Sequence, residues 1–90
     1  MKAIWNGVVL AESADTLVMD GNHYFSAASL KREFTTFSNH RSRGVYGDEQ
    51  WLSLFVNGDL LPDAIWFHPD PSLDALKDRV AFVRGVQITE

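Results

Sequence analysis

The feature that most constrains this chain is the dipeptide Asn57-Gly58, which interrupts a largely apolar stretch between Trp51 and Phe67. Asparagine and glycine adopt positive φ most readily, and a two-residue type I′ turn needs positive φ at both central positions. The flanking apolar runs therefore predict two paired antiparallel strands. Because both strands are apolar on both faces, we expect this hairpin in the middle of the core. Pro62 lacks an N–H group, so it predicts a bulge or an edge within the second strand.

Two further turn signals precede this hairpin. Asn6-Gly7 separates two short apolar runs, and Asp20-Gly21-Asn22 separates another pair, where the extra Asn allows a three-residue loop. Residues 79–83 and 86–88 are predicted to form closing strands. Three such turns favour a mainly β fold, an antiparallel meander, over βαβ units.

Two short helices are predicted between the strands. The first covers residues 27–34, where Ser26 can cap the helix and two apolar residues lie four positions apart. The second covers residues 73–78, with Ser72 or Asp70 as its cap.

No hydrophobic period is present in residues 35–50, which are polar and contain Gly44 and Gly47. The segment is predicted to be a long loop, and loops of this length in compact domains are more often functional than merely connective.

Composition limits the class of protein. Ninety residues with 46% apolar content form one domain, residues 1–90. The absence of cysteine excludes disulfides and thiolate nucleophiles. The net charge of −4 argues against general nucleic-acid binding. No stretch approaches the roughly 20 apolar residues of a membrane span, and the short apolar run in residues 1–13 predicts no signal peptide. We therefore expect no membrane association and a cytoplasmic location.

Known catalytic and cofactor motifs are absent. The sequence has no GxSxG elbow, no GxxxxGK[ST] loop and no GxGxxG fingerprint. The histidines show no metal-ligand spacing, and we expect His23 and His68 to be exposed at strand ends. The aspartates between residues 59 and 74 match no calcium loop. We therefore predict no catalytic residue, no metal and no cofactor.

One local charge pattern suggests a ligand site. Lys31, Arg32, Arg41 and Arg43 are half of the eight basic residues, and between positions 31 and 43 only Glu33 opposes them. Arginine can bind a phosphate or carboxylate through two hydrogen bonds. Tryptophan and tyrosine at a pocket rim can stack on a planar ligand, although the same residues also serve as core. The predicted site residues are Tyr24, Lys31, His40, Arg41, Arg43 and Trp66.

Nearly the whole chain carries a family resemblance. The matching segments are residues 5–7, 10–13, 21–25, 29–33, 53–58, 62–66, 80–82 and 85–86, together with Pro69 and Pro71. The most specific pieces are Asp63-Ala64-x-Trp66-x-x-Pro69-x-Pro71 and Val80-Ala81-Phe82. On these residues the chain resembles the bacterial family known as domain of unknown function 427. The resemblance implies a β-tent-like fold of two small antiparallel sheets that lean together, related in shape to methionine sulfoxide reductase B.

The resemblance also carries the label nucleotidyltransferase, and in one place the chain departs from the family pattern. Members of the family usually show Cys-Pro-Trp/Tyr-Lys-Gly in the central segment. Here the aligned residues are Arg43-Gly44-Val45-Tyr46-Gly47, so only the last glycine matches. An activity that needs that cysteine or lysine is not expected in this chain.

Three functional hypotheses follow. The first is a non-enzymatic binding domain for a small anionic or planar ligand. The second is a nucleotidyl- or other group-transfer enzyme that holds a divalent metal through acids such as Asp59 and Asp63. The third is a homodimeric interaction protein, because residues 80–88 hold one charge, Arg84, and could form an unprotected sheet edge.

Overall fold

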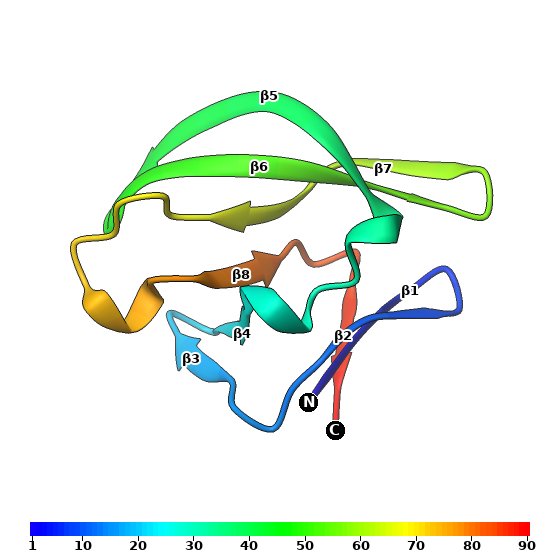
Figure 1. Cartoon of the computed structure of the whole chain (residues 1–90), viewed down its shortest axis with the longest axis horizontal. Helices are drawn as coiled ribbons and strands as arrows, with labels where there is room; N and C mark the ends of the chain where they lie inside the picture. The colour runs from blue at the N-terminus through cyan, green and yellow to red at the C-terminus, as the bar shows by residue number, and fades with distance from the viewer.

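Nine strands and three single-turn 3-10 helices make up the fold, and the structure, a computed structural model, describes residues 1–90 (Figure 1). The strands are β1 (Lys2–Trp5), β2 (Val8–Glu12), β3 (Leu17–Met19), β4 (Asn22–Ser26), β5 (Thr35–Gly44), β6 (Gly47–Val56), β7 (Asp59–Phe67), β8 (Arg79–Phe82) and β9 (Gln87–Thr89). The 3-10 helices are η1 (Ala27–Ser29), η2 (Arg32–Phe34) and η3 (Asp74–Leu76). None of these helices is long and apolar enough to cross a membrane.

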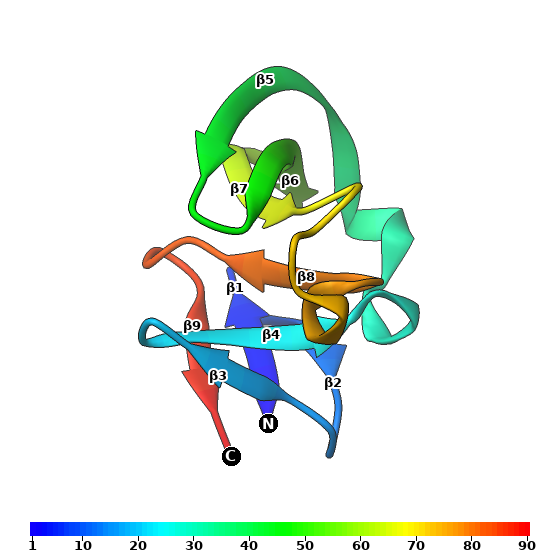
Figure 2. The same ribbon diagram turned by 90° about the vertical axis from the view of Figure 1, so that its left-hand side faces the viewer.

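The strands form two antiparallel sheets, which confirms the predicted mainly β, two-sheet fold. A six-stranded sheet has the order β3-β4-β8-β7-β6-β5, and a three-stranded sheet has the order β2-β1-β9. Strands β5 to β8 follow one another as the predicted meander. The pairing of β4 with β8 and of β1 with β9 then joins distant parts of the chain, so both chain ends lie at the small sheet (Figure 2).

The three turn signals are confirmed. Asn6, Asp20 and Asn57 have φ of 54°, 52° and 52°, and the glycine after each also has positive φ. Met19 pairs with Asn22, so the second turn is a two-residue loop rather than the three-residue alternative.

The expected irregularity at Pro62 is a β-bulge. Ser53 of β6 faces residues 62–64 of β7, and Asp63 there has φ of 49°. The Asp63 N–H group donates to Ser53 Oγ at 3.0 Å. A second bulge lies in β5, where the Ser38 hydroxyl donates to the Asp63 carboxylate. Bulges increase the local bend of a strand, and two of them side by side accompany the arch of β5 over the molecule (Figure 1).

Neither predicted helix forms as an α-helix. Residues 27–34 contain two 3-10 turns, because Leu30 between them pairs with Ala11 in an isolated bridge and is itself buried. The Lys31 N–H group donates to Leu10 O at 2.8 Å, which holds the segment against β2. The second predicted helix is the single turn η3. Tertiary pairing here outweighs a weak helical preference.

The predicted loop over residues 35–50 is wrong. It contains strand β5 and the start of β6, joined by a tight turn at Val45-Tyr46. Strand β5 is one of the two edge strands of the large sheet, and none of its residues is buried. A strand without a buried face has no reason to alternate apolar with polar residues, so its sequence carries no period.

The core lies between the two sheets. It combines Ala3 and Leu10 from the small sheet with Phe25, Leu54 and Ile65 from the large sheet, all of them without exposed surface. A smaller cluster of Tyr24, Leu76 and Ala81 lies apart from it, and because side chains alternate along β8, it takes the face opposite Val80 and Phe82.

Two expectations about exposure are corrected by this packing. The central hairpin is only partly core, because its far end protrudes and leaves Phe55 and Leu60 exposed (Figure 1). Strand β8 lies inside the sheet between β4 and β7, so of residues 80–88 only β9 forms an edge. The homodimer stays a prediction, with β3 and β5 of the large sheet and β9 of the small sheet as edges open to a second copy.

Candidate functional site

Three of the predicted site residues belong to one row of aromatic rings. Tyr24 meets Trp66 edge to face, with ring centroids 6.3 Å apart, and Trp66 Nε1 donates to the Tyr24 hydroxyl at 3.3 Å. Trp66 contacts Trp51 at 5.4 Å, and Trp51 contacts His40 at 5.2 Å. The rings therefore mostly contact one another, and Trp51 is a member that the prediction omitted.

The predicted cations do not join this row. Arg41 and Arg43 pair with Gln50 and Asp48 across the β5–β6 hairpin and line an open polar groove. Ser42 between them accepts a hydrogen bond from Trp51 Nε1 at 3.0 Å, so it lies on the ring face. Because neighbouring side chains of a strand point to opposite faces, the two arginines lie on the face away from the rings.

Lys31 is separate from both groups. It is exposed, lies just before η2 and lines no cavity of the structure. The six predicted residues thus do not converge on one surface, although binding by any of them stays a prediction.

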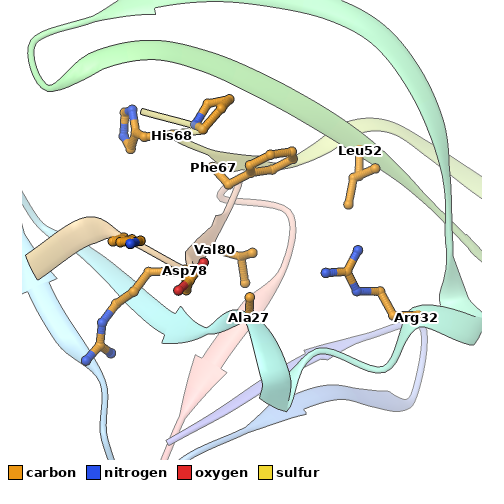
Figure 3. A pocket seen from close by; sticks show the side chains of 10 residues that line it. Ala27, Arg32, Leu52, Phe67, His68, Asp78 and Val80 are labelled. Atoms are coloured by element: carbon orange, nitrogen blue, oxygen red, sulfur yellow. The ribbon is translucent and has the colours of Figure 1, made fainter. Parts of the chain in front are cut away.

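A better enclosed cavity lies between β7, β8 and the 3-10 turns, and we name it the Arg32 cavity (Figure 3). Its volume is about 240 Å³. Its lining residues are Ala27, Arg32, Leu52, Phe67, His68, Pro69, Lys77, Asp78, Arg79 and Val80. Figure 3 shows the Arg32 guanidinium reaching in from one side, with Phe67 and Leu52 above and Ala27 and Val80 below. An apolar wall with a few charged groups is typical of small-molecule sites.

The charged groups of the Arg32 cavity differ in whether they have partners within the protein. Arg79 is held, because its guanidinium donates to Asp15 Oδ2 at 3.2 Å and to the backbone oxygens of Asp15 and Tyr24. This pair is the only ion pair within 4.0 Å in the chain. Arg32, Lys77 and Asp78 therefore have no ionic partner, and none of their side chains makes a hydrogen bond within the protein.

The expectation that His68 is exposed is wrong. His68 follows the last residue of β7 and continues its alternation, which carries the ring to the side of Tyr24 and Tyr46 at centroid distances of 6.2 Å and 6.4 Å. Only 4% of the residue is exposed, and both ring nitrogens lack a hydrogen-bond partner and contact with solvent. The His68 residue thus lines the cavity, and Tyr24 and Tyr46 pack against its ring. His23 is also half-buried, with an unpartnered Nδ1.

Both tyrosines are predicted to ionise above their ordinary pKa of 10.0. Burial raises the pKa of Tyr24, and the hydrogen bond from the Tyr46 hydroxyl to Asp20 Oδ2, 2.9 Å long, raises the pKa of Tyr46. The folded state therefore holds the phenolic protons more tightly than the unfolded chain. This contribution to the free energy of unfolding is complete below pH 10 and is lost as the pH rises through the folded-state pKa values.

A spectrophotometric titration of tyrosinate tests this expectation directly, because the chain has only two tyrosines. The Tyr46→Phe variant reports Tyr24 alone. A midpoint at or below that of a tyrosine peptide in either protein contradicts the expectation.

Sequence reasoning missed most of the Arg32 cavity. Arg32 belongs to the basic cluster of the sequence but not to the predicted site residues. Lys77 and Asp78 lie at the end of the helix predicted over residues 73–78. The run of three charged residues, Lys77-Asp78-Arg79, directly before an apolar strand could have indicated a charged site there. The missing information was spatial, because Arg32 and Lys77 are 45 positions apart in the chain.

The aspartates of the group-transfer hypothesis are not assembled as a metal site. Asp59 accepts a hydrogen bond from Asn6 Nδ2 at 2.9 Å, whereas Asp63 is occupied by Ser38 in the bulge. No group of three or more His, Asp or Glu side chains is arranged to hold a metal ion. The residues of the chain give that hypothesis no support.

Comparison with known proteins agrees with the resemblance seen in the sequence. No curated protein matches the chain. The family model NTP_transf_9, described as a domain of unknown function (DUF427), matches residues 1–89. Because this match covers all but the last of the 90 residues, the chain belongs to the DUF427 family.

Proposed function

We propose that this domain binds a small organic anion in the Arg32 cavity. The single observation that carries the proposal is that Arg32 and Lys77, two cations without an ionic partner, line the same partly enclosed cavity. An unpaired guanidinium beside an apolar wall is a good receptor for a carboxylate or phosphate, because it offers two parallel N–H donors.

The surroundings favour an organic anion over a bare inorganic one. Leu52, Phe67 and Val80 supply apolar surface on the same cavity wall. A ligand with a carbon skeleton gains from covering this surface, at roughly 25 cal/mol per Å² of apolar area removed from water. The net charge of the chain is −4, so a local excess of positive charge is needed to attract an anion.

A thermal-shift screen of small organic acids and nucleotides tests the proposal. A ligand present at 100 times its Kd adds about 2.7 kcal/mol to the free energy of unfolding. In a domain of this size that gain corresponds to an increase in Tm of about 10–20 °C. We expect the Arg32→Gln/Lys77→Gln variant to lose the shift of any acid that stabilises the parent protein.

The matched control is the Arg41→Gln/Arg43→Gln variant. It removes the same charge from the open groove on β5, which also belongs to the site predicted from sequence. We expect it to keep the full shift. If this control loses the shift and the cavity variant keeps it, the ligand binds on β5 and the proposal is wrong. A screen in which no acid stabilises the protein also contradicts the proposal.

A further inference from the structure

The Arg32 cavity contains a charged group that simple anion binding leaves unused. Asp78 lines the same cavity as Arg32 and Lys77, and its carboxylate has no ion pair or hydrogen bond. Its φ of 58° and the hydrogen bond from the Ala27 N–H group to the Asp78 backbone oxygen, 2.8 Å long, fix the backbone at this point. The free charges of the cavity are therefore two positive and one negative.

The positions of these charges describe a ligand with two opposite ends. Figure 3 shows Arg32 and Asp78 on two sides of the cavity, with Val80 and Ala27 between them. Arg32 extends from η2, whereas Asp78 directly precedes β8. A cation on one side, a carboxylate on the other and apolar surface between them complement a molecule that carries both charges on a short hydrocarbon body.

From this arrangement, and resting on the proposed function, we infer that the ligand is a small zwitterion of the amino-acid type. Its carboxylate binds Arg32, its ammonium group binds Asp78, and its side chain covers the apolar wall. Lys77, the residue before Asp78, raises the positive charge of the cavity as a whole. The volume of about 240 Å³ suits such a molecule, since sites for drug-sized ligands usually measure about 300–1,000 Å³.

The same charges select against polyanions. A nucleotide brings two or more negative charges into a cavity whose free groups sum to a single positive charge, and Asp78 repels them. A carboxylic acid without an ammonium group satisfies Arg32 but leaves Asp78 unpaired on the other side of the cavity. An amine without a carboxylate is repelled by the two cations, Arg32 and Lys77.

Isothermal titration calorimetry with matched probes tests this inference. The first series is L-leucine, 4-methylpentanoate and 3-methylbutylamine, and the second is L-phenylalanine, 3-phenylpropanoate and 2-phenylethylamine. Within each series the three molecules differ only in which charged group is present. We expect the amino acid of at least one series to bind ten or more times as tightly as both of its analogues. Adenosine monophosphate serves as the polyanion and is expected to bind more weakly than that amino acid.

Two variants test which residue binds which charged group of the ligand. Asparagine tolerates positive φ, so Asp78→Asn keeps the backbone and removes only the charge. We expect it to reduce amino-acid affinity at least tenfold, to about that of the matching acid, without weakening the acid itself. Arg32→Gln is expected to weaken the amino acid and the matching acid alike.

The outcomes separate this inference from the proposed function. If the acids or adenosine monophosphate bind as tightly as the amino acids and Arg32→Gln weakens them, the zwitterion is wrong and anion binding stands. If Asp78→Asn leaves amino-acid affinity unchanged, the zwitterion is also wrong. If no amino acid, acid or nucleotide binds, both are wrong.

Discussion

Replacement of Phe25 by alanine is expected to remove about 3–5 kcal/mol from the free energy of unfolding, the usual cost of truncating a buried phenylalanine. Phe25 has no exposed surface and contacts Phe82 edge to face at a centroid distance of 5.5 Å. Domains of this size have only about 5–15 kcal/mol of stability in total, so the loss is a large fraction of it. Urea unfolding followed by tryptophan fluorescence measures the change.

Phe37→Ala is the matched control for this experiment. It removes the same atoms from a residue that is 77% exposed on β5, so we expect a change within about 0.5 kcal/mol. A loss at Phe37 comparable with that at Phe25 would show that the β5 edge is covered in solution, and it would support the predicted homodimer. A small loss at Phe25 would contradict the core described here.

Replacement of Gly47 by alanine is expected to cost about 3 kcal/mol and to loosen the β5–β6 turn. Gly47 has φ of 119°, a conformation whose strain for other residues is about 1–3 kcal/mol. A Cβ atom there would also lie 3.0 Å from the backbone oxygen of Asp70, and such crowding adds about 1–3 kcal/mol. The turn touches the 70–72 segment through the Ser72 N–H group, which donates to Tyr46 O at 2.8 Å.

Gly58→Ala separates backbone strain from crowding. Gly58 has φ of 84°, but no atom lies within 4 Å of the position that its Cβ would take. We expect this control to cost only the left-handed penalty of about 1–2 kcal/mol. Hydrogen exchange of the Ser72 amide should accelerate in Gly47→Ala and stay unchanged in Gly58→Ala. Equal effects of the two substitutions on stability and exchange would show that the turn does not depend on its contact with Asp70.

The predictable parts of the fold were those set by local chemistry. Asn6-Gly7, Asp20-Gly21 and Asn57-Gly58 each force a reversal of the chain that does not depend on its surroundings. Strand β5 was not predictable in this way, because its pairing with β6 is a property of two segments and its own residues face solvent. The helix expected over residues 27–34 does not form for a related reason, since Leu30 pairs with Ala11 of β2.

The candidate site was less predictable than the fold. Neighbours in sequence, such as His40 and Arg41, lie on opposite faces of a strand, so a cluster along the chain need not be a cluster in space. Arg32 and Asp78 show the converse, because they line one cavity and yet belong to segments that the sequence gives no reason to connect. Tyr24 and Trp66, both among the predicted site residues, do lie in contact, with ring centroids 6.3 Å apart.

The pairing of β1 with β9 also sets an order for the folding of this chain. Lys2 lies opposite Thr89, so the small sheet is complete only when β9 is available. Strands β5 to β8 pair one after another along the chain, and the second partner of β8, strand β4, precedes them in sequence. Contacts between distant residues cost more chain entropy to form than local ones. During synthesis β1 therefore leaves the ribosome early but remains without one of its two partners until β9 follows, while the meander can fold ahead of it.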